Sequence, residues 1–241
     1  MRIVHASDWH GRLIELPEAD VYVFTGDMLS NHPVVERDYG LRLWKIDPSF
    51  ERVKQAEWLA ERGYPHRGML ASPDAPIVAV RGNHDFIDAA ALFPGADVTE
   101  LIGNEVHEIA GLRFTGHRGI PWIHGTWSDE THRPDLIDRM RAMPQADVYV
   151  THYPPHGVLD SDGPEHHRDD VAGIHYGLEE MAYWLVKRTL PSVWEVEREL
   201  GDQPPSSLHL FGHIHECGGM TRRISTVLFS NAATTFNVID F

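Results

Sequence analysis

The chain has 241 residues, of which 42% are hydrophobic, and these values suit one large domain with a substantial buried core. The formal net charge of -15 argues against a dedicated duplex-binding role, because an acidic surface repels a polyphosphate backbone. No segment approaches the ~18 consecutive apolar residues that a membrane-spanning helix needs.

The sequence contains a single cysteine, Cys217, so an intrachain disulfide is excluded. The first residues, M-R-I-V-H-A-S-D, enter a strand pattern at once and lack the charged start, apolar stretch and cleavage site of a secretory signal. Both features are typical of a reducing compartment, and we expect a cytoplasmic protein.

Short apolar runs rich in β-branched and aromatic residues recur along the chain, and each ends in a polar cluster. Such runs are typical of strands buried on both faces. We predict strands at residues 2–6, 20–25, 76–80, 147–150 and 208–211, and further strands within 222–231 and 236–241. Residues 105–118 predict a hairpin that turns near Ala110 and Gly111.

Helical patterns lie between these strands. Residues 48–62 begin with a proline, and Phe50, Val53 and either Ala56 or Trp58 follow a helical period. Residues 134–143 and 177–190 predict two more helices, and 193–200 would extend the last beyond a proline. The segments 163–172 and 203–207 are polar and predict loops.

This order of elements predicts an α/β chain, which some schemes class as α+β. We expect a single domain over residues 1–241, built as a four-layer α/β/β/α sandwich in which two mixed sheets pack together and helices lie outside. No internal repeat or long linker marks a second domain.

Five polar clusters follow the predicted strands, and ligands of such sheets bind outside the carboxyl ends of the strands. We therefore expect the clusters to converge there. Asp, His and Asn are ligands of divalent metals such as manganese, iron and zinc. In each of the pairs Asp8/His10 and His213/His215, residues i and i+2 project to the same side. The candidate ligands are Asp8, His10, Asp27, Asn83, His152, His213 and His215.

One metal ion rarely takes so many protein ligands, whereas two ions could share them if Asp27 bridged the pair. Sites with two metal ions suit displacement at phosphorus. Two divalent cations bring four positive charges, and Asp8, Asp27 and a bridging hydroxide remove three of these. Such a site would attract an anionic phosphate ester despite the acidic surface.

The clusters D-x-H at 8–10, G-D at 26–27, G-N-H-D at 82–85, T-H at 151–152 and G-H-I-H at 212–215 resemble the calcineurin-like metallophosphoesterase superfamily. All five stand in order after predicted strands. The segments 16–27, 119–122, 151–160, 208–216 and 230–233 further resemble the metallophosphoesterase-domain group related to class III cyclic nucleotide phosphodiesterases.

The resemblance implies two metal sites. Asp8, His10, Asp27 and His215 would hold the first ion, and Asp27, Asn83, His152 and His213 the second. A metal-bridged hydroxide would attack phosphorus in line. His84 would protonate the leaving oxygen, since histidine transfers protons near neutrality, and Asp85 would orient or charge His84.

The chain departs from the superfamily after Asp27, where Ser30 replaces a common acidic residue. The Arg that protein phosphatases carry shortly after that acid is absent, which argues against a phosphoprotein substrate. Arg81 is a candidate phosphate contact, with a role as a surface cap as the alternative. Asn31 and His32 are candidate substrate contacts at the mouth of the site.

Other notable residues have simpler interpretations. We expect His5 and His209 to be core residues and Cys217 to be a small loop or core residue. His117 and residues 119–127 would either form an aromatic wall at the site or be buried in the second sheet. His156, His166 and His167 are most simply loop residues. Tryptophans Trp44, Trp58, Trp184 and Trp194 are typical of packing, and a contiguous exposed set would instead indicate a homo-oligomer.

The leading hypothesis is therefore a phosphoesterase with two divalent ions, manganese first and iron or zinc as alternatives, that hydrolyses a small phosphomonoester or phosphodiester such as a cyclic nucleotide. A metal-dependent nuclease is one alternative, which the net charge of -15 disfavours. A non-catalytic protein-binding scaffold is another, although such scaffolds usually lose ligands and every motif here is filled.

Overall fold

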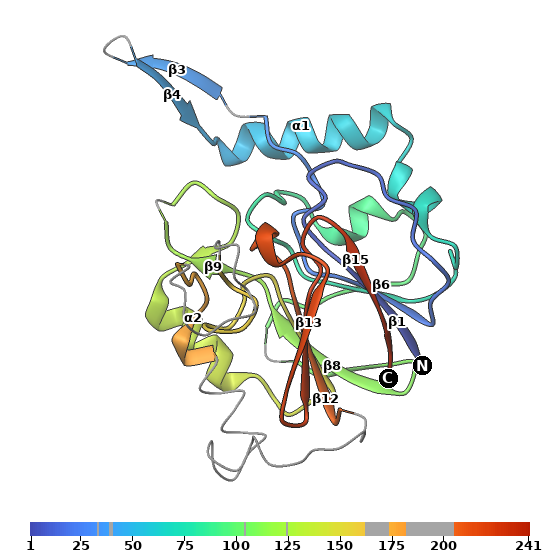
Figure 1. Ribbon diagram of the computed structural model, residues 1–241. Coiled ribbons are helices and arrows are strands. Elements are labelled where there is room, and N and C mark those ends of the chain that lie inside the picture. The colour runs from blue at the N-terminus through green and yellow to red at the C-terminus, as the bar shows by residue number, and fades with distance from the viewer. Residues whose placement is uncertain (33, 39–40, 104, 124, 162–173, 182–204) are drawn as a thin grey trace.

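The computed structural model describes residues 1–32, 34–38, 41–103, 105–123, 125–161, 174–181 and 205–241. Within these residues most strands belong to two large mixed sheets (Figure 1). The first sheet has four parallel strands and one antiparallel edge strand, the last strand of the chain. Its strands, in spatial order, are β15 (Phe236–Asp240), β1 (Arg2–Ala6), β2 (Val21–Phe24), β5 (Ile77–Ala79) and β6 (Val98–Glu100).

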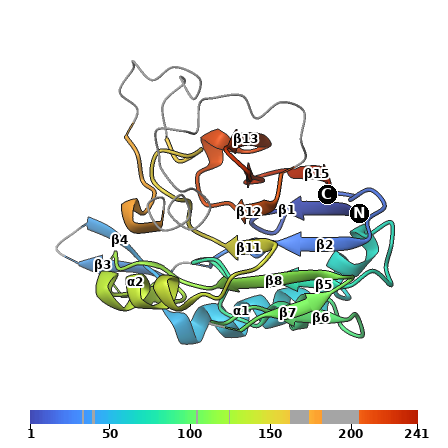
Figure 2. The same ribbon diagram turned by 90° about the horizontal axis from the view of Figure 1, so that it is seen from below.

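The second sheet also has a parallel centre, here with an antiparallel strand at each edge. Its strands, in spatial order, are β13 (Met220–Ile224), β14 (Val227–Asn231), β12 (Ser207–Phe211), β11 (Val148–Thr151), β8 (Leu112–His117) and β7 (His107–Ile109). Both views place the two chain termini side by side (Figures 1 and 2). The N-terminal amine donates to the carbonyl of Phe241 at 2.8 Å.

The space between the sheets is filled by alternate residues of the parallel strands. Ile3, Val23 and Val78 of the first sheet share one apolar cluster with Val150 and Leu210 of the second, and all five are fully buried. Their neighbours in sequence point to the outer faces, because successive side chains of a strand alternate. Both faces of each central strand are thus buried, which explains the continuous apolar runs in the sequence.

A helix covers the outer face of each sheet. α1 (Pro48–Glu61) contributes Leu59 to the cluster on the first sheet, and α2 (Arg133–Ala142) contributes Leu136 and Met140 to the cluster on the second. Asp47 caps α1 by accepting from the backbone N–H groups of Ser49 and Phe50. The four-layer α/β/β/α sandwich of two mixed sheets is therefore confirmed.

The prediction that Phe50 and Val53 belong to the buried apolar face of α1 is wrong. Phe50 and Val53 are 39% and 53% exposed, whereas Glu51, Gln55 and Leu59 are buried. The spacing i, i+4, i+8 still follows one helical stripe, but two of its three members are polar. The hydrogen-bonding partners of those two residues lie in the loops beneath the helix.

Smaller elements complete the described chain. The strands β3 (Val34–Asp38) and β4 (Leu41–Lys45) form an antiparallel pair that lies beyond the first residues of α1 in Figure 1. This pair was not predicted from the sequence. β9 (Ile120–Pro121) pairs with β10 (Glu130–Thr131). Short 3-10 helices occupy Pro65–Met69, Ala89–Leu92 and His215–Cys217.

The predicted strands and the first two helices are confirmed to within a few residues. The hairpin of β7 and β8 turns at Ala110 and Gly111, both of which have positive φ angles. The segment 222–231 proved to contain a turn, at Ser225 and Thr226, between two antiparallel strands. The predicted segments 163–172 and 193–200 lie outside the described residues, as do 182–190 of the third predicted helix, 203–204 of the second predicted loop, His166, His167, Trp184 and Trp194.

Glycines allow loops at the carboxyl ends of the strands to approach one another closely, both between the two sheets and within the first sheet. A Cβ on Gly212, which follows β12 of the second sheet, would lie 2.1 Å from Oδ2 of Asp8 and from Oγ of Ser7, which follow β1 of the first sheet. A Cβ on Gly82 would likewise lie 2.1 Å from Oδ1 of Asp27. Only glycine permits these approaches.

We predict that Gly212→Ala lowers the free energy of unfolding by about 1–3 kcal/mol, because the added methyl group overpacks a buried contact. Urea unfolding in the presence of a chelator measures this change. Gly68→Ala is the matched control, since a Cβ there meets no heavy atom within 4 Å. Equal stability of the two variants would contradict the packing argument.

His209 is buried on the outer face of β12, with the rings of Phe211 and Phe229 at centroid distances of 5.1 and 5.8 Å. Its Nε2 lies 2.9 Å from Oγ1 of Thr151. Burial lowers the pKa of His209 to about 3, so the folded protein keeps this side chain neutral. The expected core position of His209 is confirmed, and His5 is likewise fully buried.

We predict that the free energy of unfolding falls as pH falls from about 6.5 towards 3, because the unfolded chain then binds a proton that the folded His209 does not. Between pH 7.5 and 5.5 this group accounts for about 1 kcal/mol. His209→Gln should reduce the pH dependence by that amount in urea unfolding, since other groups cancel in the comparison. An unchanged pH dependence would show that His209 is protonated in the folded state.

Candidate metal centre

The candidate ligands come from loops at the carboxyl ends of five parallel strands. Asp8 and His10 follow β1, Asp27 follows β2 and Asn83 follows β5, all in the first sheet. His152 follows β11, and His213 and His215 follow β12, in the second sheet. The loops after β1 and β2 run side by side, since the N–H of His10 donates to the carbonyl of Asp27 at 2.9 Å.

Four of these residues have left-handed backbone conformations that are unfavourable for residues other than glycine. The φ angles are 56° for Asp8, 47° for His10, 55° for Asp27 and 70° for His213. Such strain persists only where the surrounding structure enforces it, and it is concentrated at functional sites. The strain therefore marks these loops as a candidate site independently of residue type.

The first ligand group contains Asp8, His10 and His215, whose ligand atoms lie within 4.8 Å of one another. The Nε2 atoms of His10 and His215 are 3.2 Å apart, and Nε2 of His215 lies 3.4 Å from Oδ1 of Asp8. The neighbouring carboxylate of Asp8 raises the pKa of His215 despite the partial burial of that ring. Three donors of the type that divalent metals prefer thus face one point.

The second group contains Asp27, His152 and His213. Nε2 of His152 lies 3.3 Å from Oδ2 of Asp27, 3.1 Å from Nδ1 of His213 and 3.0 Å from Oδ1 of Asn83. Nδ1 of His152 donates to the carbonyl of Thr25 at 2.7 Å, which leaves Nε2 to face the group. The structure therefore places Asn83 beside the second group.

Electrostatics couple the members of the second group. Burial alone would lower the pKa of His152, but the charge of Asp27, its hydrogen bond, the charge of Asp8 and the carbonyl of Thr25 together outweigh burial and raise the pKa to about 10. Burial alone would raise the pKa of Asp27, but the charges of His152 and His84 lower it. Burial and the charge of His152 lower the pKa of His213 to about 4. A bound cation would take the place of the proton on His152.

One buried oxygen tests whether these residues fit a metal ion. Oδ2 of Asp8 accepts from Oγ of Ser7 at 2.6 Å and from the N–H of His213 at 2.9 Å. Oδ1 is buried and accepts no hydrogen bond from the part of the chain that the structure describes. A buried carboxylate oxygen needs a partner, and a cation between Asp8, His10 and His215 would provide one. The donor set therefore fits divalent metal ions.

His84 lies beside both groups. Its Nε2 is 3.9 Å from Oδ2 of Asp27, and with His10 and Asp27 it forms a third group of close ligand atoms. Its ring contacts the rings of His10 and Trp127, at centroid distances of 4.6 and 4.5 Å. Nδ1 of His84 is hydrogen-bonded to Oδ1 of Asn31, so Nε2 is the nitrogen that faces the candidate centre.

Asp85, the residue expected to orient or charge His84, has its described hydrogen bonds elsewhere. Both oxygens of Asp85 accept backbone N–H groups instead, from Asp27 at 2.6 Å, Met28 at 3.0 Å, Gly82 at 3.1 Å and Leu29 at 3.2 Å. Burial and the charge of Asp27 raise the pKa of Asp85 to about 7. The acid holds the loops after β2 and β5 together, and Asn31 provides the contact to the ring of His84.

Two residues of α1 complete this arrangement, and the sequence analysis missed both. Nε2 of Gln55 donates to the carbonyl of His84 at 2.6 Å, and Oε1 accepts from the N–H of Phe86 at 2.8 Å. Glu51 accepts from Nδ2 of Asn31 at 3.3 Å and from the N–H of His32 at 2.7 Å. The sequence feature that could have indicated them is their spacing: Glu51 and Gln55 stand four residues apart, and the apolar Leu59 follows four residues later on the same side of α1.

The structure shows contacts of Asn31 and His32, the expected substrate contacts, within the protein. Asn31 bonds His84 and Glu51, and Nδ1 of His32 lies 3.8 Å from Oε2 of Glu51. Ser30, which replaces the acid common in the superfamily, donates its hydroxyl to the carbonyl of His10. These residues support the loops around the candidate centre.

Arg81 is also placed differently from the expected phosphate contact. Its guanidinium is buried and forms ion pairs with Glu100 at 2.9 Å and with Asp88 and Asp129 at 3.5 Å. Arg118 pairs with Asp129 at 3.2 Å in the same cluster. Three carboxylates compensate the charge of Arg81, so the geometry assigns it to this cluster and not to a phosphate.

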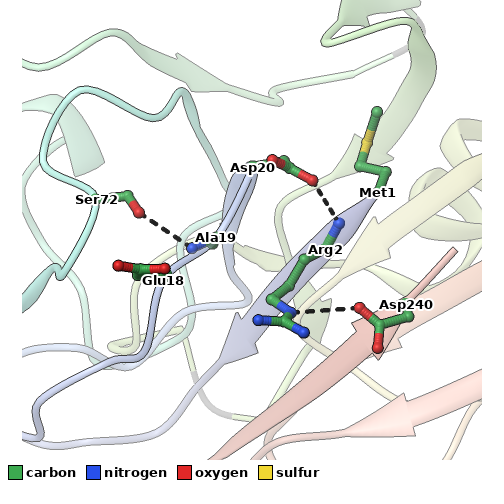
Figure 3. Close-up of a pocket in the computed structure, with 7 residues that line it drawn as sticks. All are labelled: Met1, Arg2, Glu18, Ala19, Asp20, Ser72 and Asp240. Carbon is green, nitrogen blue, oxygen red and sulfur yellow. Dashed lines mark hydrogen bonds and ion pairs between the residues drawn. The ribbon is translucent and has the colours of Figure 1, made fainter.

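A hollow lies at the opposite ends of the strands, beside the start of β1 and β2 (Figure 3). Its charged groups are partly paired, since Nε of Arg2 lies 3.3 Å from Asp240 and the N–H of Arg2 donates to Asp20 at 2.7 Å. Glu18, Ala19, Ser72 and Met1 complete its lining. The ligand groups described above do not extend to it.

Of the remaining candidates, His117 is fully buried in β8, which confirms burial in the second sheet, whereas Trp127 reaches the candidate centre. Cys217 is buried beside the carbonyl of Ser161 at 3.5 Å.

Among the described residues, no helix has the length and apolar character to cross a membrane.

Comparison with known proteins agrees with this geometry. The model of the family described as calcineurin-like phosphoesterase matches residues 1–217, which include every candidate ligand. The chain is also similar to metallophosphoesterase domain-containing protein 1 of Homo sapiens and of Mus musculus. It is 26% identical to each over 255 residues, which cover 98% of this chain and 67% of each relative. From the extent of the family match, this chain belongs to the calcineurin-like phosphoesterase family.

Proposed function

We propose that the protein is a hydrolase with two divalent metal ions that cleaves a small phosphate ester. Family membership and the ligand groups support a metal-dependent phosphoesterase. The observation that carries the finer proposal is the pair of groups Asp8/His10/His215 and Asp27/His152/His213, which the shared group His10/Asp27/His84 links. Two adjacent sets of ligands suit two ions, with Asp27 between them.

Asp8, His10, Asp27 and His215 would hold the first ion, and Asp27, Asn83, His152 and His213 the second. When bound, two divalent ions supply positive charge for the phosphoryl oxygens and lower the pKa of the water that acts as nucleophile. Mixed nitrogen and oxygen ligands suit manganese, and also iron or zinc. The protein itself positions the ligands, since strained loops of the two sheets hold the ligand side chains in place.

His84 would donate the proton that the leaving oxygen needs. Its side chain is 26% exposed, so it can meet a substrate, and its Nε2 faces the Asp27 carboxylate. Asn31 fixes the ring orientation through Nδ1, and Gln55 holds the backbone carbonyl of the same residue. A fixed imidazole beside the reacting phosphorus is suited to general acid catalysis.

The substrate we propose is a small phosphomonoester or phosphodiester, with cyclic nucleotides as the first candidates. A net charge of -15 would repel a long polyanion, whereas a local cationic centre would still attract one phosphate. We propose that the protein acts in the cytoplasm and binds neither nucleic acid nor membrane as a partner. Association with further copies of this chain is a separate proposal, testable by sedimentation.

Removal of metal should abolish the proposed activity. We predict that the chelated protein does not hydrolyse an aryl phosphate ester, that manganese restores hydrolysis, and that elemental analysis then finds about two ions per chain. Asp27→Ala should lose metal from both groups, because its carboxylate lies between them. His107→Ala, a histidine on β7 away from the centre, is the control and should retain both ions. Full activity after chelation would refute the proposal.

We predict that His84→Ala retains both metal ions yet loses about 10²–10⁴-fold in kcat, the usual contribution of a general acid. Asn31→Ala should lose a smaller factor, because the imidazole remains but its orientation is no longer fixed. Metal analysis and steady-state kinetics of the same samples separate the possible roles. Loss of a metal ion from His84→Ala would make His84 a ligand and refute its role as the acid.

A further inference from the structure

A loop between β9 and β10 brings one aromatic side chain, Trp127, close to His84. The two strands pair in parallel, so the intervening residues must loop back from the end of β9 (Figure 1). Trp127 is half-buried, and its ring lies 4.5 Å from that of His84 between centroids. A large aromatic side chain that keeps part of its surface exposed beside the candidate centre is suited to contact with a ligand.

The loop is fixed to the candidate centre through its backbone. The N–H of Ser128 donates to the carbonyl of Asn83 at 3.0 Å, which joins the loop to a residue of the second ligand group. At the outer end, the ring of Trp122 stacks on His132 at a centroid distance of 4.5 Å. Gly125, with φ of +83°, allows the chain to pack on Trp122, since a Cβ there would lie 2.3 Å from the ring.

Trp127 and His10, a ligand of the first group, both contact the ring of His84, at centroid distances of 4.5 and 4.6 Å. A leaving group whose oxygen reaches Nε2 of His84 must extend away from the phosphorus. Such a group would come close to the indole ring of Trp127, because that ring contacts the imidazole of His84.

We propose that Trp127 binds the leaving group of the substrate and favours leaving groups that carry a flat aromatic ring, as in aryl or nucleoside phosphates. This inference rests on the proposed phosphoesterase function. An indole face binds aromatic groups of many kinds because it recognises their π-faces and not a hydrogen-bond pattern. A residue of this kind selects a class of leaving group without selecting one compound.

The charges at the base of the loop favour an uncharged ring over an anionic leaving group. Arg81 and Arg118, which lie there, are both compensated by Glu100 and Asp129. The leaving group would therefore meet an apolar indole beside a neutralised ion-pair cluster. The negative charge of the substrate would be confined to the phosphoryl group at the centre.

The test compares phenyl phosphate with hexafluoroisopropyl phosphate, since their leaving alcohols are of similar acidity but only one is aromatic. We expect the wild-type protein, loaded with manganese, to have the higher kcat/KM for the phenyl ester. Trp127→Ala should lower the ratio of the two kcat/KM values about tenfold, which corresponds to about 1.4 kcal/mol. Trp127→Phe should restore most of the ratio, because a phenyl ring can still stack.

Trp122→Ala is the matched control, since Trp122 belongs to the same loop but packs on His132, and it should leave the ratio unchanged. An equal loss of activity on both esters in Trp127→Ala would overturn the inference, because Trp127 would then act only by supporting His84. An unchanged ratio without loss of activity would overturn it as well.

A binding measurement separates this inference from the proposed function. Calorimetric titration of the manganese-loaded protein with phenylphosphonate and methylphosphonate, which are not hydrolysed, should show tighter binding of the phenyl compound. That preference should disappear in Trp127→Ala and remain in Trp122→Ala. If the wild type hydrolyses neither ester, the phosphoesterase proposal fails, and the titration still decides whether Trp127 binds an aromatic group.

Discussion

The buried carboxylate of Asp27 joins loops from both sheets, and the rest of the candidate centre depends on it. Oδ1 accepts from the backbone N–H of His84 at 2.7 Å, and Oδ2 lies 3.3 Å from Nε2 of His152. A carboxylate with no solvent contact must find such partners, because an uncompensated buried charge is very costly. This requirement brings the loop after β2 against the loops after β5 and β11, and it sets the distance between the two sheets at that edge.

A second set of polar contacts keeps this arrangement in place from the side of α1. Asp85 binds four backbone N–H groups of the surrounding loops, and Glu51 and Gln55 bind Asn31, His32 and the backbone of His84. None of these side chains needs to touch a substrate. Their effect is to hold the loops that carry His84 and Asp27, whose backbone is left-handed, so that ligand positions are fixed before any metal or substrate binds.

The chain as a whole is acidic, whereas the candidate centre gathers histidines around two carboxylates. This separation suits a protein that admits one phosphate group and repels long polyanions. The loop with Trp127 adds an apolar side to the same centre. Charge would then select the phosphoryl group and the indole would select what is attached to it, with His84 at the boundary between the two.

The sequence alone determined the five strands that precede the motifs, the sandwich and the family, because strands buried on both faces are continuous apolar runs and because each motif stands directly after one of them. It also determined which residues are candidate ligands, since Asp, His and Asn in these spacings have few other uses. It did not determine which polar residues serve the centre indirectly. Asp85 and Arg81 appeared suited to a direct role, and only the tertiary structure gave Asp85 four backbone partners and Arg81 three carboxylates. Glu51, Gln55 and Trp127 come close to His84 through contacts between distant segments, and hydrogen bonds or ring contacts of that kind leave no period or spacing in the chain.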